Sequence, residues 1–494
     1  MSRFQIGSID KRWVNFEPPI SGGTFRPYQV TSQKSAACGV KSGLCHSEYS
    51  TFAPKDDTTK TKVATCSCND FGTKSPSLIN AQKMESNPTD IGTFNKCPKQ
   101  FMPAEYIDYA ERLEIDSDLS HFPSMNPETQ SNIALKYRKL HRKVEEHGYY
   151  NCHYSEYAIE CFRYLSLFTL SMVALRYEWY ITSAVFLGLF WHQIMFSAHD
   201  AGHMAITHNF VIDTLIGIFV ADFCCGLSIG WWKSSHNVHH LVPNHPIHDP
   251  DIQNVPLFAT SPTFFRSIRS SYYDFCFTWN KGAEIAVGFQ KYTYYPIMCV
   301  ARFNLYLLSL QFLVSDKSRT LGSAYWTRPT ELLCMVCYWY MFVYLLLLKS
   351  IPTWTLRVAF VLVSHIVTMP LHVQITLSHF GMSTADLGAS ESFAQKQLRT
   401  TMDIDCPTWL DFIHGGLQFQ AVHHLFPRVP RHNLRKVQRL VKEFCKEVGI
   451  EYTIYGFVDG NKVVLSRLGE ISKQVKILAA CQKHMVETGE SGLN

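Results

Sequence analysis

Hydrophobic residues are distributed unevenly along this chain of 494 residues. The sequence is polar up to about Gln130, and long apolar runs begin at about Tyr157. A helix needs roughly 20 apolar residues to cross the hydrocarbon core of a membrane. The pattern therefore predicts an all-α integral membrane protein with four transmembrane helices. The predicted spans are Ile159–Leu175, Trp179–Ser197, Leu332–Leu348 and Leu356–Leu377.

Two further apolar stretches, Phe210–Gly230 and Ile297–Val314, are interrupted by polar residues. We expect them to lie in the membrane interface or to pack against a polar domain. The polar composition before residue 130 is typical of disorder. Three regions follow: a mostly disordered N-terminal region at 1–130, a membrane domain at 131–455 and a C-terminal tail at 456–494.

Three short histidine clusters lie beside the apolar stretches. On a helix, positions i, i+3 and i+4 share one face, so each cluster would present its side chains together. Imidazole suits iron, zinc, copper or nickel, and spacing alone does not choose among these metals. The clusters therefore predict one shared metal centre. Their members are His199 and His203; His236, His239 and His240; and Gln420, His423 and His424.

A shared centre constrains the topology because all three clusters must lie on one side of the membrane. An even number of crossings then separates successive clusters, as the four predicted spans allow. Lys and Arg concentrate in the segments that carry the clusters, whereas the two short opposite turns carry little beyond Arg176 and Lys349. Positive charge on short flanks marks the cytosolic side. We therefore expect a cytosolic helical domain that carries the histidines, with both termini in the cytosol.

Charge and cysteine content exclude two other classes. The net charge of +5 gives no reason to expect a nucleic-acid partner, and the 16 cysteines lack the regular spacing of a disulfide framework.

Histidine ligands need acceptors that fix their ring tautomers. Asp200, Asp249 and Asp251 are candidates by their proximity in sequence.

The clusters resemble the three histidine boxes of the membrane fatty-acid desaturases, and Gln420 in place of a first histidine resembles the front-end branch of that superfamily. Over about residues 133–455 the chain is similar to fungal sphingolipid 8-desaturases. The segments that carry this similarity are Trp191-His192-Gln193, His199-Asp200-Ala201-Gly202-His203-Met204, Leu227-Ser228-Ile229-Gly230-Trp231-Trp232-Lys233, Asn244-His245-Pro246, His248-Asp249-Pro250-Asp251-Ile252-Gln253 and His424-Leu425-Phe426-Pro427-Arg428.

This resemblance implies a di-iron, O2-dependent enzyme of the endoplasmic reticulum membrane. It would introduce a trans double bond at carbon 8 of the long-chain base of ceramides, a sphingolipid substrate. Gln420 would bind iron weakly or hydrogen-bond a bound water. His192, His208, His245, His248 and His372 would support the site. The implied iron ligands, all but His379 also implied as catalytic, are His199, His203, His236, His239, His240, His379, His423 and His424.

Members of the resembled subfamily usually begin with a cytochrome b5 domain, marked by His-Pro-Gly-Gly, which does not occur in this sequence. The opening, Met1 to Gly23, resembles the stretch after that domain, so we expect that the domain was lost or that the chain starts late. No haem is then expected in this chain. Electrons would come from external cytochrome b5 and its reductase. The basic residues Arg428, Arg431, Arg435 and Lys436 predict a docking surface for that acidic carrier.

Three alternatives remain. A front-end acyl-lipid desaturase of the delta-5 or delta-6 type would use the same boxes. A non-redox membrane protein could hold zinc through histidines, although such a site needs about three or four ligands and eight candidates exceed that. A non-catalytic relic is the third, and the complete set of boxes argues against it.

Overall fold

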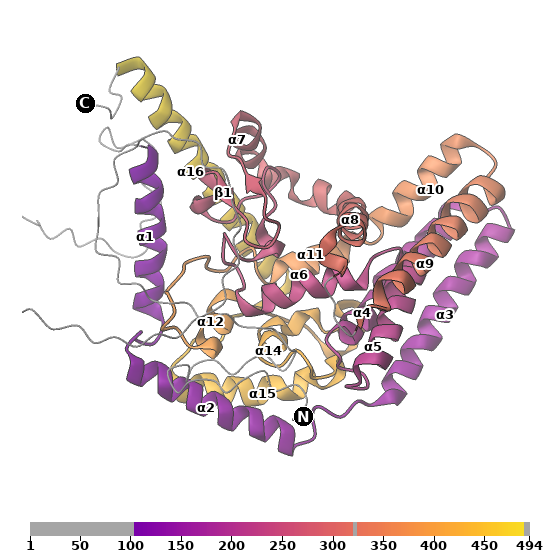
Figure 1. Ribbon diagram of the computed structural model, residues 1–494, viewed down its shortest axis with the longest axis horizontal. Coiled ribbons are helices and arrows are strands. Elements are labelled where there is room, and N and C mark those ends of the chain that lie inside the picture. The colour runs from indigo at the N-terminus through magenta and orange to yellow at the C-terminus, as the bar shows by residue number, and fades with distance from the viewer. Residues whose placement is uncertain (1–102, 320–323, 489–494) are drawn as a thin grey trace, which may run out of the picture. The chain divides into compact units, whose positions relative to one another are not determined.

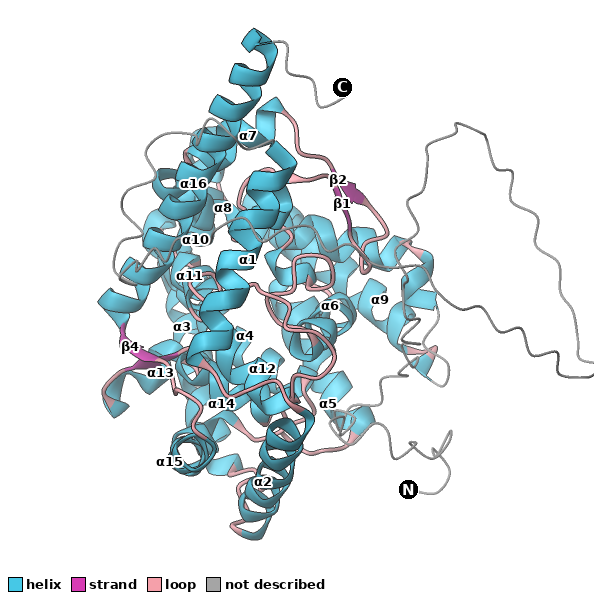
Figure 2. Cartoon of the chain, turned by 90° about the vertical axis from the view of Figure 1, so that its left-hand side faces the viewer, coloured by secondary structure: helices cyan, strands magenta, loops and turns pink. Residues whose placement is uncertain are grey.

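The computed structural model describes residues 103–319 and 324–488, and nearly all regular structure in these ranges is helical. Two short strand pairs complete it: β1 (Ile268–Arg269) with β2 (Cys276–Phe277), antiparallel, and β3 (Asp403–Asp405) with β4 (Ile454–Gly456), parallel. Figures 1 and 2 show the helices from two sides. The predicted all-α class is confirmed in this coarse form.

Within the described residues, five helical stretches are long and apolar enough to cross a membrane. Four of them contain the predicted spans, and the fifth, α8 (Gln290–Val314), contains a stretch that was expected at the interface. Helix length and composition therefore support a multi-pass protein without fixing four crossings. The other four are α3 (Tyr154–Arg176), α4 (Tyr180–Gly202), α9 (Thr327–Trp339) continued by the π-helix η8 (Tyr340–Lys349), and α10 (Trp354–Ile366) continued by α11 (Met369–Leu377).

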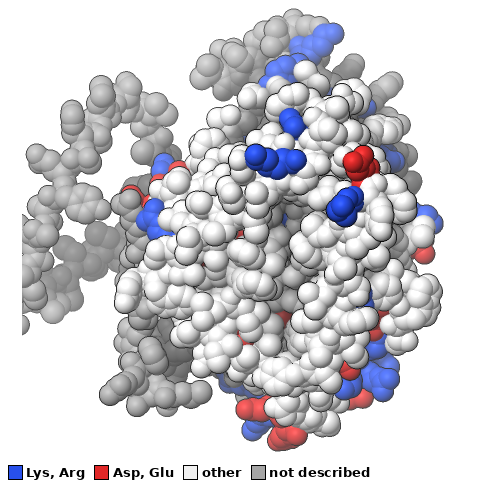
Figure 3. Space-filling model, turned by 90° about the vertical axis from the view of Figure 1, so that its right-hand side faces the viewer, with Lys and Arg blue, Asp and Glu red and all other residues white. Residues whose placement is uncertain are grey.

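The outer face of these helices is apolar. Only 17% of the most hydropathic window of α3 is buried inside the protein, so most of its apolar side chains face outward. Phe162 on α3, Val336 on α9 and Val358 on α10 are all more than half exposed. Figure 3 views the side where α3, α9 and α10 lie in Figure 1, and shows a broad surface with few charges. Such a surface suits lipid rather than water.

The stretch Phe210–Gly230 does not form a long helix. It forms α5 (Phe210–Gly217), a π-helix, η3 (Ile218–Phe223), and a turn into α6 (Ile229–Leu241). The turn passes through Gly226, whose φ of +69° and whose contact with the Tyr338 ring leave no room for a side chain. This segment is not among the candidate spans, in agreement with the prediction.

A polar helical layer carries the rest of the described chain. In it, α2 (Pro127–Glu146), α14 (Gln420–Leu425) and α15 (Arg431–Val448) share one apolar core, in which Tyr137, Phe426 and Val441 are buried. Apart from one long helix at each end of the described chain, the remaining helices of four or more residues are η5 (Pro262–Phe265), α7 (Lys281–Gly288), η6 (Asp316–Arg319), α12 (Phe393–Thr400) and α13 (Asp411–His414), and the three-residue 3-10 turns are η4 (Pro250–Ile252), η9 (Thr408–Leu410) and η10 (Leu417–Phe419).

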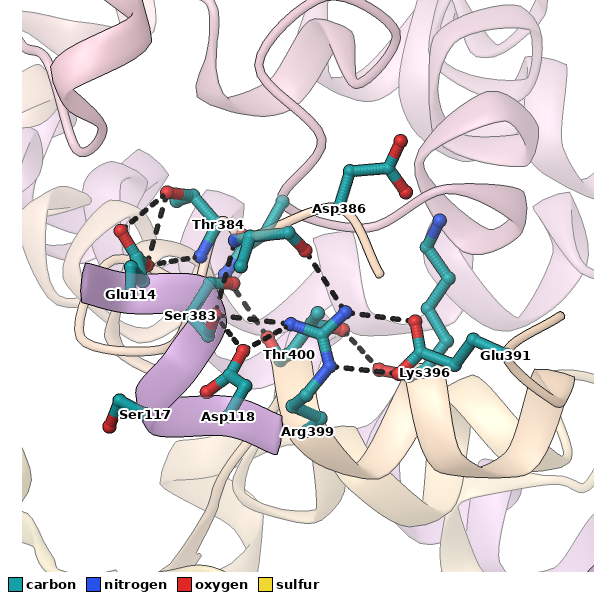
Figure 4. Close-up of polar contacts among 12 residues, drawn as sticks. Glu114, Ser117, Asp118, Ser383, Thr384, Asp386, Glu391, Lys396, Arg399 and Thr400 are labelled. Carbon is teal, nitrogen blue, oxygen red and sulfur yellow. Dashed lines mark hydrogen bonds and ion pairs between the residues drawn. The ribbon is translucent and has the colours of Figure 1, made fainter. Parts of the chain in front are cut away.

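The expected N-terminal disorder does not extend to residues 103–130. Residues Pro103–His121 form α1, and buried ion pairs hold this helix: Asp118 accepts from Arg399 at 2.7 Å, and Glu114 pairs with Arg467 at 2.7 Å. Arg399 also pairs with Glu391 at 2.8 Å (Figure 4). The prediction took polar composition as a sign of disorder, but the carboxylates of Glu114 and Asp118 form ion pairs in a folded helix. The prediction was therefore wrong for these residues. Residues 1–102 lie outside the described ranges.

The predicted C-terminal tail is also helical over most of its length. α16 (Phe457–Thr488) buries Val464, Leu468, Ile471 and Val475 at helical spacing against α7, α8 and α1. That periodicity was available in the sequence. The domain boundaries at 130 and 455 themselves stay predictions.

We expect Arg399→Leu to destabilise the protein by about 3–5 kcal/mol, because it leaves the carboxylates of Asp118 and Glu391 buried without their cation. Thermal unfolding in detergent micelles, followed by tryptophan fluorescence, measures the loss. Arg269→Leu is the matched control, since the Arg269–Asp274 pair is 72% and 76% exposed and should contribute nothing measurable. Equal melting temperatures for the two variants would contradict the role of the buried pair.

Candidate metal centre

The first two histidine clusters meet where α4 ends beside α6. His199 lies in the last turn of α4 and His203 caps its C-terminus, while the second cluster lies on α6. A Cβ on Gly202 would lie 2.1 Å from the Trp232 ring, so only glycine allows the two helices this approach. Trp232 in turn stacks on His236 with ring centroids 4.4 Å apart. The glycine between the two histidines of the first cluster thus sets the distance between the clusters.

The α6 helix is held at its N-terminus by groups from three directions. Ser228 accepts from the Trp231 amide, and Glu331 on α9 accepts from the Ser228 hydroxyl at 2.5 Å and from the Gly230 amide at 3.0 Å. Asp222 accepts from the Ile229 amide. A helix N-terminus favours such carboxylates because its amide dipoles point toward them. The second cluster therefore starts from a fixed end.

The third cluster lies on α14, and His379 follows the C-terminus of α11. Together with the first two clusters they form two adjacent groups whose potential ligand atoms lie within 4.8 Å of one another. His240 lies between the groups, with its ring centroid 4.7 Å from that of His203 and 4.2 Å from that of His424. All eight predicted ligands thus converge, although ligation itself stays a prediction. The groups are His199, His203, His236 and His423; and His239, His379 and His424.

Acceptors beside the rings fix which nitrogen faces the centre. His239 Nδ1 lies 2.8 Å from Asp249, and His236 Nδ1 lies 3.4 Å from Asp251. His199 Nδ1 lies 3.7 Å from Asp200. The three aspartates predicted from the sequence therefore do lie beside the three histidines. The hydrogen bonds of Asp249 and Asp251 turn the other ring nitrogen of His239 and His236 toward the cluster, as outer partners do in metal sites.

One such acceptor was missed. Gln397 on α12 lies 2.9 Å from His424 Nδ1 through its Oε1 and donates to the His240 carbonyl at 2.9 Å. It precedes the third cluster by more than twenty residues, and nothing in the local sequence distinguishes it from other glutamines. Only the packing of α12 against α14 brings it to the site.

The titration of most of these rings favours neutral imidazole, and His239 is an exception. Burial, together with neighbouring histidines, lowers the pKa of His203, His240 and His423 well below its usual value. Burial opposes protonation of His239 as well, but the carboxylates of Asp249 and Asp251 outweigh it and raise its pKa to about 9. Neutral rings keep the lone pair that a metal ion needs.

The unpaired ring nitrogens fit a bound metal. Buried polar atoms normally have a hydrogen-bond partner. Six nitrogens of this cluster are buried and have none among the described residues, and His236 Nε2 approaches His240 Nε2 to 3.2 Å. Metal ions would bind these nitrogens, and the two groups of histidines offer positions for two such ions. The six are His199 Nε2, His203 Nε2, His240 Nδ1, His379 Nδ1, His423 Nε2 and His424 Nε2.

Four other residues predicted for the site lie outside the two groups. His208 faces the Tyr150 carbonyl, His245 faces Asp386 and His248 faces Ser271, so none of these three belongs to the two groups. Gln420 is buried on α14, three residues before His423. The supporting roles of the first three residues and the role of Gln420 stay predictions.

The predicted basic docking surface is wrong for Arg431, one of its four residues. Arg431 is buried, pairs with Asp200 at 2.5 Å and also pairs with Glu160 on α3. Arg435 pairs with Asp411 at 2.5 Å. An amphipathic pattern does not reveal which cations are buried with carboxylates. Arg431 therefore joins the first box to α3 and α15 instead of facing a partner.

Several known proteins have sequences similar to that of this chain. A family model described as fatty acid desaturase matches residues 178–456, which include all eight histidines. A Delta 8-(E)-sphingolipid desaturase from Emericella nidulans is 48% identical over 99% of this chain and 86% of that protein. A protein of the same name from Komagataella phaffii is 44% identical over 97% and 83%. A Delta(8)-fatty-acid desaturase from Helianthus annuus is 38% identical over 70% and 75%.

We expect His423→Ala to lose bound transition metal. Losing an outer partner lowers metal affinity about 10–100-fold, and losing a ligand should cost more. Metal per chain, measured by mass spectrometry on protein purified without chelator, checks this. His248→Ala is the control, because His248 faces Ser271 outside both groups. Wild-type metal content in His423→Ala would refute the assignment of that ligand.

Proposed function

Because this chain belongs to the fatty acid desaturase family, we propose that it is a membrane sphingolipid 8-desaturase. It introduces a trans double bond at carbon 8 of the long-chain base of ceramides. The observation that carries this proposal is the high identity, over almost the whole chain, with two fungal proteins of that activity. The second candidate is an acyl-lipid desaturase, which the shorter match to the Helianthus annuus protein favours.

The proposed cofactor is a pair of iron ions held by the eight histidines, with O2 as co-substrate. Iron, when bound there, supplies the activation of dioxygen needed to take hydrogen from an unactivated methylene. One turnover takes two hydrogens from the lipid and consumes O2, two protons and two further electrons, giving two waters. The alternative of a single hydrolytic zinc would use about four ligands and would leave the other histidine rings without a metal ion to bind.

The protein's own part is to hold and isolate this centre. Asp249, Asp251 and Gln397 fix the orientation of three rings from outside the cluster. Six of the eight histidines are buried, which keeps bulk water from the place where hydrogen is abstracted. The apolar helices present the lipid substrate from the membrane side.

We propose external cytochrome b5 and its reductase as the electron source. Since Arg431 is buried, we place the docking surface on the exposed basic residues of α2 and α15. These include Lys139, Arg142, Lys436 and Arg439. These two helices pack against each other and against α14, which carries the third box. Steering by such a surface weakens as salt rises.

We propose four crossings in the endoplasmic reticulum membrane, with the histidines and both termini in the cytosol. The second and third boxes contribute to the same groups of ligands, so an even number of crossings must separate them. Between them lie the candidate helices α8, α9 with η8, and α10 with α11. Two crossings satisfy the parity only if α8 stays on the cytosolic side of the membrane, although it is long enough to cross.

Expression of the chain in a host that lacks 8-unsaturated long-chain bases tests the activity. We expect mass spectrometry of released long-chain bases to detect the trans 8-unsaturated product, and we expect His423→Ala to abolish it. With purified protein, product should require cytochrome b5, its reductase and NADH, and the rate should fall with salt. A polyunsaturated acyl chain in place of the unsaturated base would favour the acyl-lipid candidate instead.

Single cysteines test the topology in a chain whose native cysteines are replaced by serine. Ser390→Cys lies on an exposed loop of the polar layer and should react with an impermeant thiol reagent added to sealed microsomes from the cytosolic side. Arg176→Cys and Pro352→Cys lie in the opposite turns and should react only after the membrane is opened. Labelling of all three in sealed microsomes would rule out the four-span arrangement.

A further inference from the structure

His192 on α4 presents a hydrogen-bond donor that has no partner within the described part of the chain. Gln193 Nε2 donates to the Phe412 carbonyl at 2.9 Å and lies 3.1 Å from His192 Nδ1. Since an amide nitrogen can only donate, His192 Nδ1 accepts, and the proton of the neutral ring lies on Nε2. His192 is 5% exposed, and its Nε2 is buried with no partner among the described residues.

Gln374 on α11 presents the complementary acceptor. Its Nε2 donates to His414 Nδ1 at 3.2 Å and to the Ile413 carbonyl at 3.4 Å. Its Oε1 therefore points elsewhere, and this atom is buried and unpaired within the described chain. Gln374 is 4% exposed. A buried acceptor without a donor is costly unless a ligand supplies one.

His192 and Gln374 share neighbours on α13. Gln193 and Gln374 donate to the consecutive carbonyls of Phe412 and Ile413 in α13, and His414 lies near both His192 and Gln374. Phe412 on α13 and Trp409 just before it are 45% and 71% exposed. Exposed aromatic residues of this kind are typical of the membrane interface, the depth at which lipid headgroups lie.

We propose that His192 and Gln374 bind the secondary amide at the head of the lipid substrate, which deepens and rests on the proposed function. The amide carbonyl accepts from His192 Nε2–H, and the amide N–H donates to Gln374 Oε1. A secondary amide offers one donor and one acceptor, which matches the unpaired pair. An ester headgroup lacks the donor and would leave Gln374 Oε1 unpaired.

The distance from this site to the metal centre suits reaction at carbon 8. His192 and His199 are seven residues apart on α4, so they share a face and lie about 10.5 Å apart along the axis. Six bonds separate C2, which carries the amide, from C8, and an extended chain covers them in about 8 Å at about 1.3 Å a bond. A hydrogen bond to the amide and the length of an imidazole ring cover the difference between this chain length and the distance from His192 to His199.

The surroundings between the two sites are apolar. Phe196, one turn after His192, packs its ring against the His192 ring with centroids 5.2 Å apart. It forms a buried cluster with Leu371 and Leu417, from α11 and from the turn before α14. Methylenes that run from the amide toward the histidines would therefore pass apolar side chains.

The test pairs a variant with a modified substrate, in the full chain reconstituted with cytochrome b5, its reductase and NADH. The probes are a ceramide and its N-methyl analogue, which lacks the amide donor. For the wild type, N-methylation should raise KM about tenfold, since it leaves Gln374 Oε1 buried and unpaired. For Gln374→Leu, KM for the ceramide should rise about tenfold, and N-methylation should add nothing further.

His192→Phe gives an independent measurement, because it removes the donor and keeps a ring of similar size. Its KM for the ceramide should rise about tenfold as well, while metal content stays at the wild-type value in both variants and shows that they fold. Gln311→Leu, an exposed glutamine on α8, is the control and should leave KM unchanged.

The outcomes separate this inference from the proposed function. If the wild type forms the 8-unsaturated base but N-methylation and Gln374→Leu raise KM independently and multiply, the amide does not face Gln374 and the inference is wrong. Wild-type KM in both His192→Phe and Gln374→Leu would also overturn it. If the wild type forms no 8-unsaturated base, the proposed function fails, and this inference fails with it.

Discussion

The buried ring nitrogens of the histidine cluster are the constraint on which the arrangement of this protein depends. They lack hydrogen-bond partners within the described chain, so their burial is favourable only if metal ions satisfy them. Each carrier helix is accordingly fixed by buried polar contacts of its own. Glu331 and Asp222 hold the start of α6, Arg431 ties Asp200 beside His199, and Gln397 holds His424 on α14.

The helices of the apolar bundle contribute to the same purpose, because irregular backbone buried among apolar side chains is costly unless its polar groups are paired. The turn between η3 and α6 leaves carbonyls that no helix satisfies. Trp191 on α4 donates to the Cys224 carbonyl, and Arg302 on α8 donates to the Cys225 carbonyl at 2.8 Å. Side chains of the apolar bundle thus satisfy backbone carbonyls of the segment that precedes the second histidine cluster.

What the sequence could predict follows from the range of each interaction. Histidines at helical spacing, and aspartates within about a dozen residues of them, are local patterns, and the structure brings both to the site. Gln397, Glu331 and the Asp118–Arg399 pair act across long separations, and composition carries no sign of them. Arg431 was mistaken for a surface residue because a basic amphipathic helix has the same pattern whether or not one of its cations is buried. The helical period of α16 was present and was missed.

The buried link between Arg431 and Asp200 joins positions 231 residues apart, and His423 and His424 precede Arg431 by only a few residues. A ribosome makes the chain from its N-terminus, so the first two histidine clusters are synthesised well before the groups that complete them. Until α14 and α15 emerge, their imidazoles lack the histidines of the third cluster and the buried Arg431. The set of eight histidines is therefore complete only late in synthesis, and a chain cut short before α14 would carry the first two clusters without the groups that enclose them.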